Sequence, residues 1–316
     1  MRIGLFISET WGAGSPIEEV RRRAVRTEEL GFASGWVPYL PWSLDALSSL
    51  QAAGDATSRL ELGTAVIPTY LFHPLALARQ AATVQAAIDR PLHLGVGCSN
   101  EAVIAMHGLD YDRPARHVRE YLEVLCPALA TGAHPTGERE AAGQVHYEGE
   151  FFRVGSIYAT PGATEPGSVL VGALGPHMLR AAGRFADGTI ATWSDAGAIE
   201  RVISPPLRQA AEAAGRGEPR IAGVIPVLFS DDEKAARAHA QQHFGFYETM
   251  PRYRRMLELG NAKQMADVCV IGNEDSVAEQ LRGFEKAGMT DFLAAPLAFE
   301  AASWDTTVER LATVLD

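Results

Sequence analysis

Residues 60–96 decide the fold, and they read LELGTAVIPTYLFHPLALARQAATVQAAIDRPLHLGV. Two short apolar runs, 60–67 and 92–96, enclose a longer alanine-rich run that begins at Pro74 and ends near residue 88. Short runs of this kind favour strands, and proline is well suited to the first turn of a helix. The stretch therefore predicts a strand, a helix and a second strand, the unit that builds parallel sheets.

The same alternation continues on both sides of this unit. Further strands are predicted at 3–7, 35–37, 169–173, 188–193, 221–229 and 291–296, and further helices at 16–30, 44–57, 114–131, 177–185, 231–246, 276–287 and 304–315. Near-strict alternation of eight strands with helices favours an α/β fold with a closed (β/α)8 TIM barrel over an open sheet. We predict one domain over residues 1–316, with insertions near 132–166 and 248–265.

Composition excludes several classes of protein. The chain has 316 residues and a formal net charge of −11, which is unlike the basic face that binds nucleic acid. Its three cysteines, Cys98, Cys126 and Cys269, are far apart, as in a reduced cytoplasmic protein. The apolar start is too short for a signal peptide, and no run approaches the ~18 apolar residues of a membrane span. We expect a soluble cytoplasmic protein with neither nucleic-acid nor membrane partners.

Several segments at the ends of predicted strands carry a family resemblance. They are LGTAVIPTYLFHP (62–74), HLGVGCS (93–99), YDRPARHVREYLE (111–123), VGALGP (171–176), ADGTIATW (186–193) and TDFLAAP (290–296). In order and spacing they resemble the luciferase-like monooxygenase superfamily, most closely the branch that uses the deazaflavin coenzyme F420. The resemblance implies a bacterial-luciferase-like barrel that acts on a small-molecule substrate, and we expect a homodimer.

The resemblance implies where a flat cofactor ring would lie. At the end of the third strand it places a non-prolyl cis peptide between Ala65 and Val66, and this peptide supports the ring from behind. Thr64, the residue before it, is assigned to the same cofactor site. After the fourth strand it assigns Cys98, Ser99 and Asn100 to the cofactor. The small residues there let the backbone approach the ring. A dinucleotide fingerprint is not expected, because Asn100 fills its third glycine position.

A cofactor phosphate is expected at the end of the fifth strand. Residues 173–175 are Ala173, Leu174 and Gly175, and Pro176 then opens a helix. The free N–H groups of Leu174 and Gly175 suit an anion, because a helix N-terminus carries partial positive charge. In the family a hydroxyl after the sixth strand completes the phosphate site, and Thr192 stands at that place.

Two side chains are candidate proton donors. Tyr39 ends the second strand, and Glu101 follows the fourth, where it could equally cap a helix. Related sugar-phosphate dehydrogenases carry an Asp-His pair near the first position, whereas this chain has Tyr39-Leu40. No histidine shows metal-ligand spacing with an acidic partner, so we expect no metal. The spacing of the arginines at 113, 116 and 119 is more typical of a solvated or salt-bridged helix face than of a site that binds an anionic tail.

These observations predict an F420-dependent oxidoreductase that transfers hydride between deazaflavin and a small organic substrate. A reductase is favoured, because no clear buried base is present to abstract a substrate proton. One alternative is an FMN-dependent monooxygenase of the same fold. A second is a barrel without cofactor that serves as a binding subunit.

Overall fold

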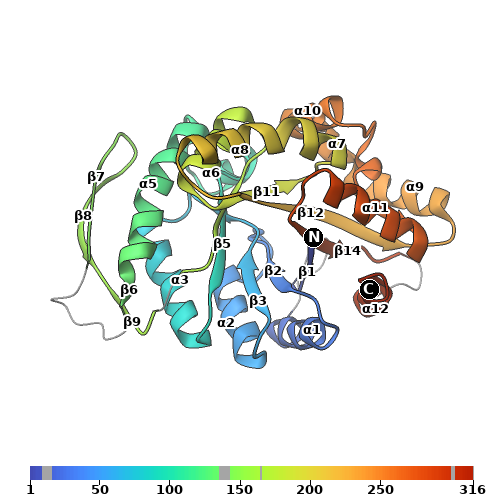
Figure 1. Ribbon diagram of the computed structural model, residues 1–316, viewed down its shortest axis with the longest axis horizontal. Coiled ribbons are helices and arrows are strands. Elements are labelled where there is room, and N and C mark those ends of the chain that lie inside the picture. Colours follow the sequence, from blue (N-terminus) through green and yellow to red (C-terminus); the bar gives the residue numbers. More distant parts are fainter. Residues whose placement is uncertain (9–15, 135–142, 164–165, 300–302, 316) are drawn as a thin grey trace.

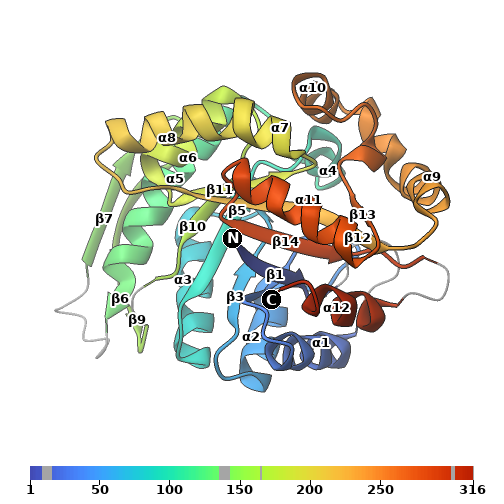
Figure 2. The same cartoon turned by 45° about the vertical axis from the view of Figure 1, so that its right-hand side comes forward.

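The computed structural model describes residues 1–8, 16–134, 143–163, 166–299 and 303–315. Within these ranges eight parallel strands form one closed barrel, as Figures 1 and 2 show. Strand β14 pairs with β1, and β10 pairs with β5, so that the sheet has no free edge. In order around the barrel the strands are β1 (Arg2–Phe6), β2 (Ser34–Val37), β3 (Glu61–Thr64), β5 (Leu92–Gly97), β10 (Val169–Gly172), β11 (Gly188–Thr192), β12 (Arg220–Phe229) and β14 (Asp291–Pro296). The predicted barrel is confirmed.

Helices cover the outside of the barrel. The longer ones are α1 (Ile17–Glu29), α2 (Ala46–Ala56), α3 (Pro74–Ile88), α5 (Pro114–Gly132), α6 (Pro176–Phe185), α8 (Ser204–Ala213), α9 (Glu233–Phe244), α11 (Glu274–Lys286) and α12 (Trp304–Ala312). Short elements join them: β4 (Ile67–Pro68), α4 (Glu101–Met106), α7 (Ala196–Ala198), the π-helix η2 (Ile199–Ile203) and β13 (Val270–Gly272). Among the described residues, no helix is both long and apolar enough to cross a membrane.

Several of these elements were not expected from the sequence, among them helix α8 and strand β13. Helix α8 has two consecutive prolines in its first turn, which read as a loop in sequence although proline is well tolerated there. Strand β13 has three residues and pairs with β12 outside the main barrel order. Such a short run has no periodicity to detect.

Each of the two predicted insertions contains regular structure. In the first, β7 (Gly143–Glu148) and β8 (Arg153–Tyr158) form an antiparallel hairpin beside α5, at the left of Figure 1. The two-residue strands β6 (Ala133–His134) and β9 (Thr160–Pro161) pair next to it. The second region contains the 3-10 helix η3 (Gly245–Thr249) and helix α10 (Pro251–Leu259), followed by the 3-10 helix η4 (Met265–Asp267).

The barrel interior is packed with large apolar side chains. Trp36 is fully buried, and its indole N–H donates to the Ser34 hydroxyl at 2.8 Å. Gly63 on the next strand leaves room for this ring, because a Cβ there would lie 2.5 Å from the indole. The interior cluster consists of Phe6, Trp36, Leu170, Ile190, Ala222, Val224, Leu293 and Ala295. It separates the two ends of the barrel.

A network of charged side chains occupies the amino ends of the strands. Arg220 forms a bidentate pair with the buried Asp291, with its two nitrogens 3.2 and 2.7 Å from the carboxylate oxygens. His93 lies 2.9 Å from Glu61, which also pairs with Arg2. Hydrogen bonds from His93 and then Arg2 lower the pKa of Glu61 to about 2. These ion pairs and hydrogen bonds link β1, β3, β5, β12 and β14 at this end of the barrel.

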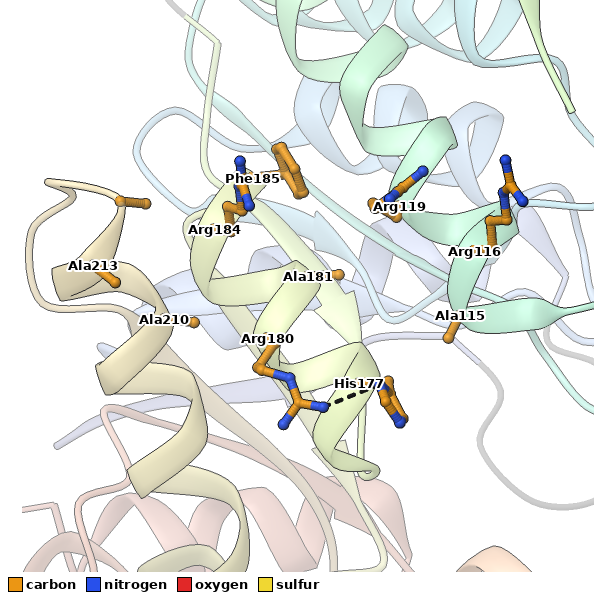
Figure 3. A pocket seen from close by; sticks show the side chains of 11 residues that line it. Ala115, Arg116, Arg119, His177, Arg180, Ala181, Arg184, Phe185, Ala210 and Ala213 are labelled. Atoms are coloured by element: carbon orange, nitrogen blue, oxygen red, sulfur yellow. Dashed lines mark hydrogen bonds between the residues drawn. The ribbon is translucent and has the colours of Figure 1, made fainter. Parts of the chain in front are cut away.

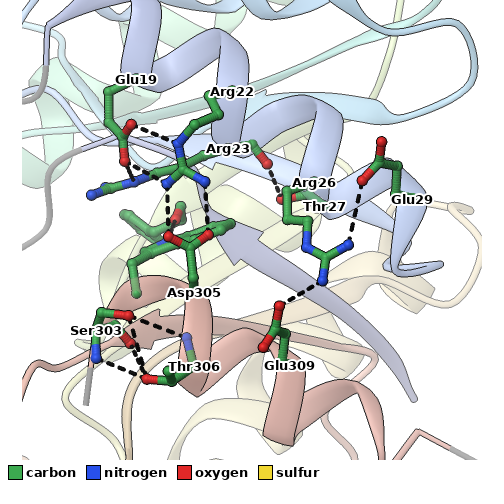
Figure 4. Close-up of polar contacts among 12 residues, drawn as sticks. Glu19, Arg22, Arg23, Arg26, Thr27, Glu29, Ser303, Asp305, Thr306 and Glu309 are labelled. Carbon is green, nitrogen blue, oxygen red and sulfur yellow. Dashed lines mark hydrogen bonds and ion pairs between the residues drawn. The ribbon is translucent and has the colours of Figure 1, made fainter. Parts of the chain in front are cut away.

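The last helix is joined to the first by ion pairs on the molecular surface. Arg22 of α1 bridges Glu19 and Asp305, and Arg26 reaches Glu309 of α12 (Figure 4). The indole N–H of Trp304 donates to the carbonyl of Phe6 at the end of β1 at 3.0 Å. Exposed ion pairs contribute little each, so the buried face of α12 provides most of its attachment.

Candidate functional site

A cavity of about 470 Å³ opens at the carboxyl ends of the barrel strands, where barrel enzymes keep their active sites. We call it the mouth cavity. Its lining comes from the ends of β1, β2, β3, β5, β10, β11 and β12 and from the second insertion. Ten of the residues predicted for the site line it: Tyr39, Ala65, Val66, Cys98, Ser99, Asn100, Ala173, Leu174, Gly175 and Thr192.

Ala65 and Val66 form an apolar wall of the mouth cavity. The peptide bond between Ala65 and Val66 is cis, as the family resemblance implies. Val66 faces Gly97 and Gly172, and a Cβ at Gly97 would lie 3.0 Å from a Val66 methyl. Thr64 lies behind this wall rather than in it, because its hydroxyl donates to the Gly95 carbonyl and accepts from the Gly95 N–H, both at 2.9 Å.

The segment after β5 forms a second wall of hydrogen-bonded polar groups. The Tyr111 hydroxyl donates to Cys98 Sγ at 3.0 Å and lies 3.2 Å from the Ser99 carbonyl. Burial, followed by the neighbouring Cys98, raises the pKa of Tyr111, so its phenol keeps its proton at neutral pH. Ser99 has a φ of 60°, and its carbonyl also accepts from Arg252 at 2.7 Å.

The next two predicted residues lie at the start of α4. The Asn100 side chain accepts from the Val103 N–H at 2.9 Å and so caps this helix while still lining the mouth cavity. Glu101 is the first residue of α4, its side chain is exposed, and it is not among the lining residues. Of the two candidate donors, only Tyr39 therefore borders the cavity.

Tyr39 is half-buried at the rim of the mouth cavity. Its ring packs edge-on against Phe72, with ring centroids 5.7 Å apart. Among the described residues its hydroxyl has no hydrogen-bond partner, which leaves it free to bond a ligand. Trp42, three residues further, is 62% exposed and lies outside the lining.

The N-terminus of α6 supplies free backbone donors. Gly175 is its N-cap residue and Pro176 its first residue, with no side chain capping the helix. Within the described chain, the N–H groups of Leu174 and Gly175 have no acceptor, and a Cβ at Gly175 would meet open space. Thr192 reaches the same side of the mouth cavity from β11. This arrangement suits an anionic group.

The second insertion covers the mouth cavity with aromatic and basic side chains that sequence reasoning did not assign. Tyr247, Arg252 and Tyr253 line the cavity from η3 and α10. Trp193 is buried beneath them, with its ring 4.7 Å from that of Tyr247. The only sequence signal was the Pro-Arg-Tyr run at 251–253, which has no characteristic spacing to any strand end. No three His, Cys, Asp or Glu side chains of the described residues lie close enough together to hold a metal ion.

We expect His117 to make the stability of the protein depend on pH. It stacks on Tyr70 with ring centroids 3.9 Å apart, and burial lowers its pKa from 6.5 to about 4. Between these values the unfolded chain binds more protons than the folded one, so stability is present above pH 6.5 and falls as pH drops. We expect the free energy of unfolding to be ~1–2 kcal/mol lower at pH 5 than at pH 7 because of this group.

Urea unfolding of the wild type and of His117→Phe at both pH values measures that contribution. Phenylalanine keeps the stacked ring and does not titrate, so the variant should lose less stability between pH 7 and pH 5. Equal losses in the two proteins would show that His117 is not the titrating group.

Comparison with known proteins gives consistent results. The family model of luciferase-like monooxygenases matches residues 1–291. An F420-dependent glucose-6-phosphate dehydrogenase of Nakamurella multipartita is 31% identical over 241 residues, which are 72% of this chain and 67% of the relative.

Two solved structures share the fold over nearly the whole chain. An F420-dependent secondary alcohol dehydrogenase in complex with an F420-acetone adduct has a TM-score of 0.77 at 17% identity, covering 99% of this chain and 98% of the other. A riboflavin lyase with modified FMN and riboflavin has a TM-score of 0.79 at 14% identity, covering 99% and 91%. At these identities the likeness is one of fold.

Proposed function

Because this chain belongs to the luciferase-like monooxygenase family, we propose that it is an oxidoreductase that binds coenzyme F420 in the mouth cavity. It transfers hydride between the deazaflavin and a small organic substrate. The similarity to F420-dependent dehydrogenases over about two thirds of the chain or more supports this choice of cofactor. The expected cytoplasmic location and the expected homodimer stay predictions.

The observation that carries the proposal is an apolar wall and a pair of free N–H groups in one cavity. Ala65 and Val66 back the flat ring, with Gly97 and Gly172 leaving space around Val66. The N–H groups of Leu174 and Gly175, with the hydroxyl of Thr192, bind the phosphate of the same cofactor. Ring and phosphate sites in one cavity match a flavin-type cofactor rather than a substrate alone.

The cofactor supplies the hydride chemistry, and the chain positions it and controls protons. The cavity lining is mainly apolar around Val66 and Met178, which keeps water away from the reacting face. Tyr39 borders the cavity with an unengaged hydroxyl and donates the proton that accompanies reduction of a C=C, C=N or C=O bond. Tyr111 is engaged with Cys98 and holds the wall in place.

The reductive direction is favoured over sugar-phosphate oxidation. The residues at the end of β2 are Tyr39 and Leu40, where the sugar-phosphate enzymes of the resemblance carry Asp and His. Neither a tyrosine nor a leucine supplies the carboxylate or the imidazole that those enzymes carry there. A hydride donor to an electrophilic double bond needs only a proton source, which Tyr39 provides.

Titration of the purified protein should show coenzyme F420 bound about tenfold or more tightly than FMN, a difference of ~1.4 kcal/mol. Quenching of protein fluorescence by each cofactor measures the two dissociation constants. Equal or reversed affinities would transfer the assignment to the FMN-dependent monooxygenase, and binding of neither would favour the barrel without cofactor.

Replacing Gly175 by valine should weaken F420 binding by ~1–3 kcal/mol, the cost of losing charge-assisted hydrogen bonds. A side chain fits there in the free protein, because a Cβ would meet open space, so folding should be unchanged. Gly217→Val is the matched control, since Gly217 also has open space and does not line the cavity. If both variants bind F420 like the wild type, the phosphate lies elsewhere.

A further inference from the structure

The segment that follows β5 contains a residue in an uncommon backbone conformation. Ser99 lines the mouth cavity and has a φ of 60°, in the left-handed region that residues other than glycine rarely adopt. In this region a side chain crowds its own backbone, whereas glycine, which has no Cβ, adopts positive φ as readily as negative φ. The conformation of Ser99 therefore depends on contacts that its neighbours provide.

These contacts converge on the Ser99 carbonyl. The Arg252 guanidinium donates to it through Nη1 at 2.7 Å, and the Tyr111 hydroxyl lies 3.2 Å from it. The Arg252 bond is charge-assisted, which makes it the stronger of the two. The Tyr111 hydroxyl is shared with Cys98 Sγ, at 3.0 Å. The strongest of these hydrogen bonds therefore comes from a residue 153 positions further along the chain.

The helix that carries this arginine is itself fixed at both ends. Before α10, the Glu248 carboxylate accepts from the Met265 N–H at 2.9 Å. After α10, the Asp195 carboxylate accepts from the N–H groups of Asn261 and Ala262 at 2.6 and 2.7 Å. Asp195 follows β11, so these bonds attach α10 to the barrel. The guanidinium therefore has a defined position relative to the strand ends.

We propose that Arg252 is a positioning residue, which holds Ser99 at positive φ and so keeps the segment after β5 in the shape that the cofactor ring requires. This inference rests on the proposed function, in which Cys98, Ser99 and Asn100 lie against coenzyme F420. Asn100 caps α4, so a change in the Ser99 backbone would turn Cys98 relative to that helix. Arg252 acts through the Ser99 carbonyl and not by contact with the cofactor.

A direct role for Arg252 in binding is the competing explanation. Among the described residues that line the mouth cavity, it is the only one with a charged side chain, so it could bind an anionic group of a ligand. The two roles predict different responses to Ser99→Gly. Glycine adopts positive φ without support, so the variant removes the need for positioning. It leaves unchanged what the guanidinium can bind.

The test is a double-mutant cycle of Arg252→Met and Ser99→Gly, with F420 affinity measured by quenching of protein fluorescence. In the wild-type background, Arg252→Met should weaken F420 binding about tenfold, on the scale of one lost charge-assisted hydrogen bond. In the Ser99→Gly background, the same change should weaken binding less than about twofold. Arg255→Met is the matched control, because it removes the same charge from α10 outside the cavity, and it should bind F420 like the wild type.

Two results of this cycle would contradict the proposal. If Arg252→Met weakens binding as much in the Ser99→Gly background as in the wild-type background, Arg252 contacts the ligand directly. If Arg252→Met binds F420 like the wild type, the guanidinium is not needed to hold Ser99.

Hydrogen exchange of the cofactor-free protein distinguishes failure of this proposal from failure of the proposed function. Backbone amides of residues 98–104 should exchange about tenfold faster in Arg252→Met than in the wild type, because the segment opens more often. Arg255→Met should exchange like the wild type. Unchanged exchange in Arg252→Met would overturn the positioning role whether or not F420 binds. If the wild type binds no F420, the proposed function fails, while faster exchange in Arg252→Met would still support the hold on Ser99.

Discussion

Replacing Arg220 by methionine is expected to lower the free energy of unfolding by ~3 kcal/mol, because it takes the bidentate partner from the buried Asp291 carboxylate and leaves it only Arg2, at 3.5 Å, as a counter-charge. The Asp291 side chain is 3% exposed, and the two Arg220 nitrogens that bond it lie 2.7 and 3.2 Å from its oxygens. Methionine has similar length and removes only the guanidinium. The pair joins β12 to β14, so its loss weakens two neighbouring strands of the barrel.

The matched control is Arg208→Met. Arg208 pairs with Glu218 on the surface, where both side chains are about half exposed, so the expected loss is below ~1 kcal/mol. Urea unfolding followed by circular dichroism measures both variants at pH 7. Similar losses of unfolding free energy in the two variants would show that burial does not account for the contribution of the Arg220–Asp291 pair.

Replacing Tyr39 by phenylalanine is expected to lower kcat by ~100-fold, the usual contribution of a positioned acid, while F420 affinity stays nearly unchanged. Tyr39 lines the mouth cavity and its hydroxyl has no partner in the described chain, whereas the Tyr111 hydroxyl is bonded to Cys98. Phenylalanine keeps the edge-on contact with Phe72, so the pocket shape should be preserved.

The measurement is the oxidation of reduced F420 in the presence of the fastest acceptor from a panel of enones, imines and ketones. Glu101→Gln is the comparison, because Glu101 was the other candidate and does not line the cavity; its kcat should change little. A raised KM with intact kcat in Tyr39→Phe would indicate a lining role only. Full activity in both variants would leave water as the proton source.

The family and the barrel could be predicted from the sequence. Short apolar runs alternate with helical patterns, and the segments at the strand ends keep a family order, so the resemblance to luciferase-like monooxygenases is confirmed. The cis bond was expected at Ala65 and Val66 and is present there. The alternation of strands and helices is a local pattern, which is why the sequence carries it, whereas the cis bond was expected only from the family resemblance.

Helix α8 and strand β13 were not predicted from the sequence, for two different reasons. The first turn of α8 contains two prolines, which are common in loops as well as at helix starts. Strand β13 exists only because it pairs with β12, a contact between residues more than forty positions apart. Pairing at that separation depends on the closed barrel and leaves no local signal.

The chemistry of the cavity walls and of the groove between α5, α6 and α8 (Figure 3) was decided by the tertiary structure. From the sequence, Arg252 belongs to an insertion, Tyr111 opens a helix, and Arg180 lies on an ordinary amphipathic face. Folding brings Arg252 to the Ser99 carbonyl, and it sets α6 opposite α5 so that arginines from both line one groove. The sequence by itself determines periodicity and local backbone preference, and hence the barrel. Which side chains face each other across a cavity depends on distances between strands and helices, and only the closed barrel sets those distances.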